Sequence, residues 1–81
     1  MSVRIKLVAD FQEPEPHRLL AELVLGKSRA ENFSVICEAC DKDELENYLL
    51  VIDNEGFEES ICLGCMEDAL KVGAMKLEVR P

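Results

Sequence analysis

Basic residues are scarce in this sequence. Nine lysines and arginines stand against seventeen aspartates and glutamates, which gives a formal net charge of -8 at pH 7. The stretch from Glu38 to Asp68 holds most of the imbalance, because Lys42 is its only basic residue. Sequence-independent binding to nucleic acid phosphates requires a surface rich in lysine and arginine. The composition therefore argues against that class, and nucleic acid is not the expected partner.

Long apolar runs are also missing. No stretch approaches the roughly 18 residues of a membrane-spanning helix. The first ten residues, Met1 to Asp10, alternate charged and apolar side chains, whereas a secretory signal needs an unbroken apolar stretch. We therefore expect a cytoplasmic chain without a membrane segment. In that reducing compartment disulfides are rare and free thiols are available to bind metals.

Groups that could carry catalysis are few. His17 is the only histidine, and no nucleophile stands beside it in the sequence, so we expect a solvated or capping role at the start of a helix. Ser28, Ser34 and Ser60 lie in no recognised nucleophile motif. The four glycines are scattered and form no phosphate-binding loop. These observations predict that the protein is not an enzyme.

With 81 residues, the chain is long enough for one domain and too short for two. Apolar residues make up 48% of it, but a domain this small buries only about 60% of its unfolded surface, so an additional staple is expected. We expect an α+β domain over residues 1–81 in three parts. These are a strand and helix in 1–34, a zinc-binding module in 35–72 and a terminal strand in 73–81.

The first part is predicted from two different periodicities. Apolar residues alternate with charged ones from Ser2 to Asp10, which predicts a strand with one buried face. From Glu15 to Leu25 the apolar residues recur at helical spacing, which predicts a helix that ends at Gly26 and covers one face of the sheet. A polar linker is expected at residues 27–32.

The remaining elements are predicted from apolar runs and turn residues. A β-hairpin is expected with strands at 48–52 and 57–61 around a turn at 53–56. A helix should follow from Cys62 to Gly73, with Ser60 as its N-cap and both of its cysteines on the core-facing side. The final strand, 75–79, is stopped by Pro81. We expect it at the edge of the sheet, paired with or close to the first strand.

The strongest motif is Cys-x2-Cys-x21-Cys-x2-Cys, formed by Cys37, Cys40, Cys62 and Cys65. Two residues between ligands allow both sulfur atoms to reach one ion at roughly 2.3 Å, and two such pairs complete a tetrahedron. The spacing predicts one structural Zn²⁺ per chain. Two redox disulfides, an iron or iron-sulfur site, or four unrelated buried thiols remain alternatives.

A cysteine pair, a hairpin and a second pair at the first turn of a helix resemble a treble-clef zinc finger. The resemblance covers about residues 35–72, with Cys37-Glu38-Ala39-Cys40 as the zinc knuckle and Cys62-Leu63-Gly64-Cys65 at the helix start. It implies zinc ligation by the four cysteines. Asp41 stands where such fingers often carry glycine, and the basic residues of members that bind nucleic acid are absent, so DNA binding is not implied.

The distribution of acids predicts a zinc-binding protein-interaction module or small regulator that docks on a basic protein surface. The expected contacts are the acids near the knuckle and the hairpin, namely Asp41, Asp43, Glu44, Glu46, Asp53, Glu55, Glu58 and Glu59. The plainer interpretation is that these acids only solvate a small surface. A variant of the favoured class is an acidic mimic of DNA.

Two further classes remain open from the sequence. One is a nucleic-acid-binding zinc finger that uses a local basic patch on the terminal strands, made of Arg4, Lys6, Lys76 and Arg80. The other is a thiol-based redox sensor, in which oxidation of the cysteine pairs releases zinc and unfolds the module.

Overall fold

The fold is α+β, built from one antiparallel sheet and one helix. A computed structural model describes residues 3–12, 15–26 and 34–80. The predicted linker at 27–32 and the expected stop at Pro81 lie outside these residues. In chain order the elements are β1 (Val3–Phe11), β2 (His17–Leu25), β3 (Tyr48–Ile52), β4 (Glu58–Cys62), α1 (Leu63–Lys71) and β5 (Met75–Val79).

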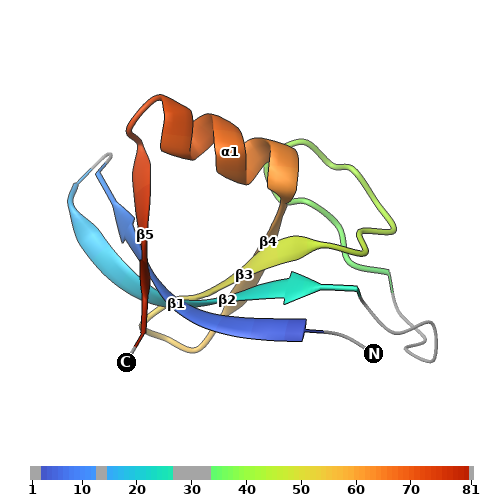
Figure 1. The fold of residues 1–81 in the computed structure, drawn as a ribbon, viewed down its shortest axis with the longest axis horizontal. Helices are drawn as coiled ribbons and strands as arrows, with labels where there is room; N and C mark the ends of the chain where they lie inside the picture. Colours follow the sequence, from blue (N-terminus) through green and yellow to red (C-terminus); the bar gives the residue numbers. More distant parts are fainter. Residues whose placement is uncertain (1–2, 13–14, 27–33, 81) are drawn as a thin grey trace.

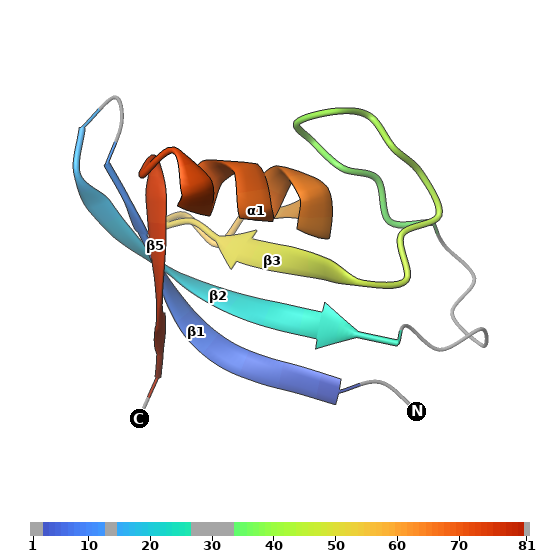
Figure 2. The ribbon, with the colours of Figure 1, turned by 45° about the horizontal axis from the view of Figure 1, so that its top comes forward.

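The five strands form one sheet in the order β4-β3-β2-β1-β5, with every neighbouring pair antiparallel. The chain meanders from β1 to β4, and α1 then carries it back so that β5 pairs with β1 (Figure 1). The expected pairing of the first and last strands is confirmed, and β5 is an edge strand. The sheet curves, and α1 lies over its concave side (Figures 1 and 2).

The predicted helix over residues 15–25 is wrong, because His17–Leu25 form the central strand of the sheet. Ala21 and Val24 are both fully buried although they point to opposite faces of this strand. A strand that is covered on both faces carries apolar residues in both parities, and its sequence cannot be told from a buried helix by periodicity alone. The role of covering the sheet, which was expected of residues 15–25, belongs to α1.

In the structure His17 lies in the β1–β2 hairpin and not at the start of a helix. This residue pairs with Phe11 at the end of the hairpin, and the two rings stack with their centroids 5.2 Å apart. The side chain is exposed, and its Nδ1 lies 2.8 Å from the Glu15 carbonyl oxygen. The solvated role expected for His17 is confirmed, but its position at a helix start is wrong.

The main core lies between α1 and the odd-numbered residues of the strands. Met66 and Ala69 of α1 pack against it. The sheet contributes a cluster of buried side chains that alternate along the strands and meet across the register, namely Leu7, Ala9, Ala21, Leu49, Val51 and Met75. This alternation is the pattern predicted for the first strand, and it explains why one short helix is enough to close this face.

A second, smaller cluster joins the sheet to the segment that carries the first cysteine pair. Val24, Tyr48 and Cys62 from three neighbouring strands pack with Val35, Cys37 and Leu45 from that segment. All six are buried. Cys37 and Cys62 are therefore part of this buried cluster, and Cys65 packs against it.

The ends of α1 are closely defined. Cys62 is the N-cap, so it belongs to β4 and its cap, not to the helix interior, and the expectation of Ser60 as cap is wrong. At the other end Gly73 has φ +77°, and the Ala74 N–H donates to the Ala69 carbonyl at 2.9 Å. This is the Schellman arrangement, which confirms the predicted closing role of Gly73.

Candidate metal centre

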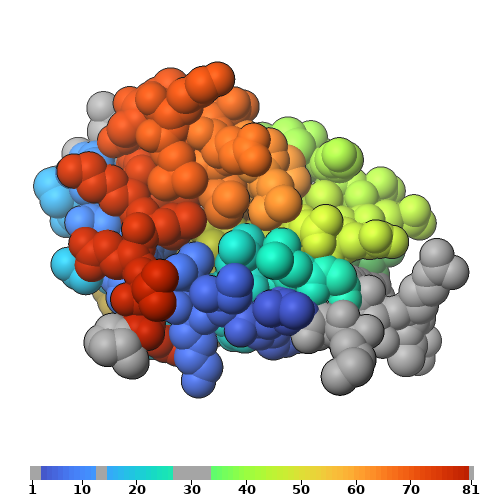
Figure 3. Space-filling model, in the orientation of Figure 1, coloured from blue at the N-terminus to red at the C-terminus, as the bar shows by residue number. Residues whose placement is uncertain are grey.

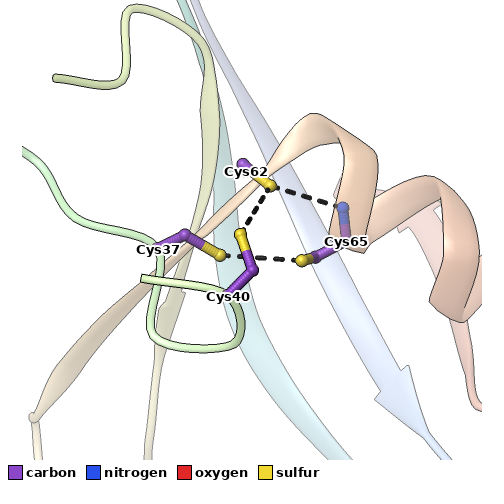
Figure 4. Close-up of side chains that lie close together, drawn as sticks. All are labelled: Cys37, Cys40, Cys62 and Cys65. Atoms are coloured by element: carbon purple, nitrogen blue, oxygen red, sulfur yellow. Dashed lines mark hydrogen bonds between the residues drawn. The ribbon is translucent and has the colours of Figure 1, made fainter. Parts of the chain in front are cut away.

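The fold brings all four cysteines to one point. Cys37 and Cys40 come from the turn that precedes β3, Cys62 ends β4, and Cys65 lies in the first turn of α1 (Figure 4). Their four Sγ atoms all lie within 4.8 Å of one another. Because the two pairs are separated in sequence by the whole β3–β4 hairpin, only the pairing of β3 with β4 places them together.

The first pair sits on a tight turn, residues 37–41, here called the cysteine turn. The Asp41 N–H donates to the Cys37 carbonyl at 2.8 Å, and the Cys37 N–H donates to the Lys42 carbonyl at 2.8 Å. Asp41 has φ +63°, in the left-handed region that glycine adopts most easily. Asp41, the residue that stands where the sequence resemblance led us to expect glycine, therefore has a backbone conformation that favours glycine.

The cysteine turn is held against the sheet by the backbone. The Glu38 N–H donates to the Ser60 carbonyl at 2.9 Å, so the turn occupies part of the outer edge of β4. Next to this contact, the Cys65 N–H points at the Cys62 Sγ at 3.4 Å. This geometry places the N-cap sulfur at the positive end of the helix dipole.

The distances between the sulfur atoms fit tetrahedral coordination of one metal ion. Two contacts cross between the pairs, Cys37 Sγ to Cys65 Sγ and Cys40 Sγ to Cys62 Sγ, and both measure 3.7 Å. A tetrahedron with metal–sulfur bonds of about 2.3 Å has edges of about 3.8 Å. A disulfide would require about 2.05 Å, and all four cysteines are free thiols. The four cysteines are positioned to bind one metal ion.

Burial and hydrogen bonding shift the pKa values of Cys37, Cys40 and Cys65 in different directions. Burial raises the pKa of Cys37, but hydrogen bonds from backbone N–H groups, above all that of Cys62, outweigh it and lower this pKa to about 6. The backbone of Lys42 lowers the pKa of Cys40, whereas the thiols of Cys37 and Cys62 raise it, and the net direction is upward. The same neighbouring thiols raise the pKa of Cys65. Of these three thiols, Cys37 therefore loses its proton most readily.

The centre lies near the surface. Cys37 and Cys62 are buried, Cys65 is half-buried and Cys40 is exposed. In the space-filling view the yellow-green surface of the segment before β3 lies directly beside the orange start of α1 (Figure 3). Small molecules such as chelators and oxidants therefore have access to the cluster from the side of Cys40.

The eight acids predicted as contacts lie at the two ends of the β3–β4 hairpin. Four of them are in the segment before β3 (Asp41, Asp43, Glu44 and Glu46), two are in the β3–β4 turn (Asp53 and Glu55), and two are at the start of β4 (Glu58 and Glu59). Asp53 is half-buried and the other seven are exposed, and none of the eight forms an ion pair with a described residue. In the β3–β4 turn, the Asp53 Oδ1 accepts the N–H groups of Glu55 and Phe57, each at 2.9 Å. The hairpin therefore presents its acids from a hydrogen-bonded, ordered turn.

The basic residues proposed as a patch share one sheet face but are not free to act together. Arg4 is paired with Glu22 at 3.6 Å. Lys76 stands opposite Asp10 in the β1–β5 register, and Glu78 lies between it and Arg80 on the same side of β5. Acids are thus interleaved with these bases.

Comparison with known proteins gives no assignment: no protein family, curated protein or solved structure matches this chain. In the described part of the chain, no helix has the length and apolar character needed to cross a membrane. The function is therefore inferred from the geometry of the centre and from the surface around it.

Proposed function

We propose that the four cysteines hold one structural Zn²⁺ in a treble-clef-type module. The observation that carries this proposal is the set of four sulfur atoms within 4.8 Å, crossed by two 3.7 Å contacts. Four soft thiolates in a tetrahedral arrangement favour zinc over the hard cations, and iron is the main competitor for the same ligands. A site filled by four protein ligands has no open position for water, so we propose a structural and not a catalytic ion.

Elemental analysis of the purified protein tests this assignment. We expect one zinc per chain and four thiols that react with a thiol reagent only after chelation or denaturation. Protein that carries iron with visible absorption, or folded protein that binds no metal at all, would contradict the proposal.

We propose further that the metal-stabilised domain is a protein-interaction module in the cytoplasm, with its acidic loops docked on a basic protein surface. The support is the set of acids, seven of them exposed, that lack ion pairs in the described structure. Those of the β3–β4 turn are held on hydrogen-bonded backbone. Complementary charge of this kind steers association and is weakened by salt. Affinity for the partner should therefore fall steeply as ionic strength rises.

Capture from a cell extract on the immobilised, metal-loaded protein tests the acidic surface. A triple variant, Glu55→Gln, Glu58→Gln and Glu59→Gln, should lose partners that wild type retains at low salt. A matched control that removes three exposed charges elsewhere is Glu15→Gln, Glu67→Gln and Asp68→Asn. Partners that resist a tenfold rise in salt, or that are lost equally from both variants, would contradict an acidic docking surface.

A redox function is a second candidate, favoured by the exposure of Cys40. Its Sγ lies 3.7 Å from that of Cys62, so peroxide could take two electrons from these thiols, form a disulfide and release the metal. Stoichiometric zinc release at low peroxide, reversed by a dithiol, would support sensing. Release only on complete oxidation of the protein would leave the ion with a structural role. The interleaved acids argue against the nucleic-acid alternative, which a gel shift at low salt tests directly.

A further inference from the structure

One row of apolar side chains crosses the face of the sheet that points away from α1. The strand register places Val8 of β1 opposite Leu20 of β2, and Leu20 opposite Ile52 of β3. We call these three residues the apolar row. Their even numbering puts them on the opposite face from the main core, whose strand residues are odd-numbered.

The apolar row is not part of either core. The segment before β3 covers this face only farther along the strands, at Val24 and Tyr48. Leu20 is 48% exposed although it sits in the middle of the central strand. Val8 and Ile52 on either side of it are half-buried, so the row forms a partly exposed apolar strip, which is a candidate contact surface.

The apolar row is also hollowed. Together with Arg18 and Asp53 it lines a groove of about 450 Å³ between β2 and the β3–β4 turn. The groove is a surface depression whose lining combines apolar side chains with the polar side chains of Arg18, Asp53 and Asn54. The groove therefore offers a partner a place for at least one large apolar side chain.

Charge differs between the two ends of the row. Beyond Ile52 the register continues to Glu58, which is exposed and forms no ion pair with the described residues. Beyond Val8 it continues to Glu78, which is already paired with Arg18 at 2.8 Å. The end at the β3–β4 hairpin is thus the one with an unsatisfied negative charge.

The distances between the residues of the apolar row fit an α-helix laid across the strands. Val8 and Ile52 are two strand spacings apart, about 9.6 Å, and Glu58 lies one spacing farther, at about 14 Å. Seven residues of an α-helix rise about 10.5 Å, and ten residues about 15 Å. A helix laid across the strands would match these positions with apolar residues at i, i+4 and i+7 and a basic residue at i+10 or i+11.

We propose that the apolar row docks an amphipathic helix of a protein partner, oriented with its basic end over Glu58. This rests on the proposed function as an interaction module and names the type of segment that the module would recognise. A second copy of the chain is disfavoured as the occupant, because each copy carries a net charge of -8 and would bring acids against acids.

Selection of peptides on the immobilised, metal-loaded protein from a displayed library of random 16-residue sequences tests the proposal. Enriched peptides, synthesised individually, should carry the apolar spacing and the basic end described above. In fluorescence anisotropy their affinity should fall about tenfold or more for Leu20→Lys, which corresponds to about 1.4 kcal/mol. The matched control Val79→Lys changes a residue that is 76% exposed on an edge strand and should bind as wild type does.

A second variant distinguishes loss of the binding surface from loss of the fold. Leu20→Thr keeps a residue that favours strands and removes the apolar side chain, so it should weaken binding while metal content and thermal unfolding stay unchanged. Peptides that bind both Leu20 variants as tightly as wild type would overturn the docking site. If those peptides still lost affinity for the Glu55, Glu58 and Glu59 triple variant, the acidic surface would stand and only this inference would fail.

The oligomeric state of the protein tests whether a second copy of the chain occupies the apolar row. Sedimentation of the wild-type protein should show a monomer at the concentrations used for binding. A concentration-dependent dimer that Leu20→Lys abolishes would assign the apolar row to a second copy and would overturn the helix partner.

Discussion

At the scale of single residues, Asp41 shows how the cysteine turn tolerates a residue that has a side chain. Its φ of +63° lies where most side chains are strained, and aspartate is among the residues that adopt this region most readily. From the sequence Asp41 was only a departure from an expected glycine, and the structure shows that its backbone conformation is one that favours glycine.

Substitution at Asp41 should therefore depend on shape more than on charge. We expect Asp41→Val to lower the free energy of unfolding by about 1–2 kcal/mol, and Asp41→Gly to be neutral or slightly stabilising. Asp43→Val is the matched control, because it removes the same charge from an exposed position at which φ is not positive. Equal losses for the two valine variants in thermal or chemical unfolding would show that charge, not backbone strain, is responsible.

The lowered pKa of Cys37 predicts how metal binding depends on pH. Metal ligands must be deprotonated, so binding releases each proton that a thiol still holds. With a pKa of about 6, Cys37 has already lost its proton at pH 7.5 and regains it by pH 5, whereas the raised pKa values of Cys40 and Cys65 keep these two thiols protonated at both pH values. Proton release per bound zinc should rise by about one between pH 7.5 and pH 5, and affinity should fall correspondingly faster below pH 6.

Titration calorimetry in buffers of different ionisation enthalpy measures this release. Binding that liberates the same number of protons at pH 5 and pH 7.5 would mean that Cys37 is not the early thiolate. The affinity itself must decrease as pH falls, since protons and zinc compete for the same sulfur atoms.

At the scale of elements, replacement of glycine by alanine should have opposite effects on stability at Gly64, inside α1, and at Gly73, just after α1. Gly64 lies inside the helix, where alanine is favoured by about 1 kcal/mol, and a Cβ there would meet only the Cys62 Sγ at an ordinary 3.8 Å. Gly73 has φ +77°, so alanine is strained there although nothing lies within 4 Å. We expect Gly64→Ala to stabilise and Gly73→Ala to destabilise, each by about 1 kcal/mol in thermal unfolding. A stabilising Gly73→Ala would contradict the Schellman closure.

β2 is the element that sequence reasoning assigned incorrectly. Leucines favour helices in isolation, and the apolar residues of 15–25 recur at three and four positions as well as at two. Tertiary packing overrides this preference, because α1 buries Ala21 on one face and the segment before β3 buries Val24 on the other. The strand 75–79, which is apolar in only one parity, was predicted with its observed bounds, and the first strand was predicted one residue early at each end.

At the scale of the whole molecule, the four-cysteine cluster joins two segments that β3 and β4 separate in sequence. The sheet core around Leu49 contains no cysteine, whereas the smaller cluster contains Cys37 and Cys62. Removal of the metal should therefore affect the second cluster first. Without an ion, four sulfur atoms within 4.8 Å are held together poorly, since any thiolates among them repel one another.

Hydrogen exchange before and after chelation tests this division. Amides of residues 35–47 and of the first turn of α1 should lose most of their protection, and those of the β1–β2 pair should lose less. Readdition of zinc should restore both, with a midpoint of thermal unfolding that rises with free zinc because only the folded state binds it. Uniform loss of protection over the whole sheet would show that the metal holds the entire fold and not one end of it.

The sequence by itself determined which four cysteines come together, the acidic character of the cysteine half, the β3–β4 hairpin and the closure of α1 at Gly73. These features are local, since they depend on spacings of a few residues, on turn chemistry or on composition. Only the tertiary structure decided that 17–25 is the central strand, that Cys62 caps α1, and that Val8, Leu20 and Ile52 form an uncovered row. The physical reason is that strand pairing and the covering of each face depend on residues far apart in the chain, so the same leucine-rich pattern fits a helix or a strand until its neighbours are in place.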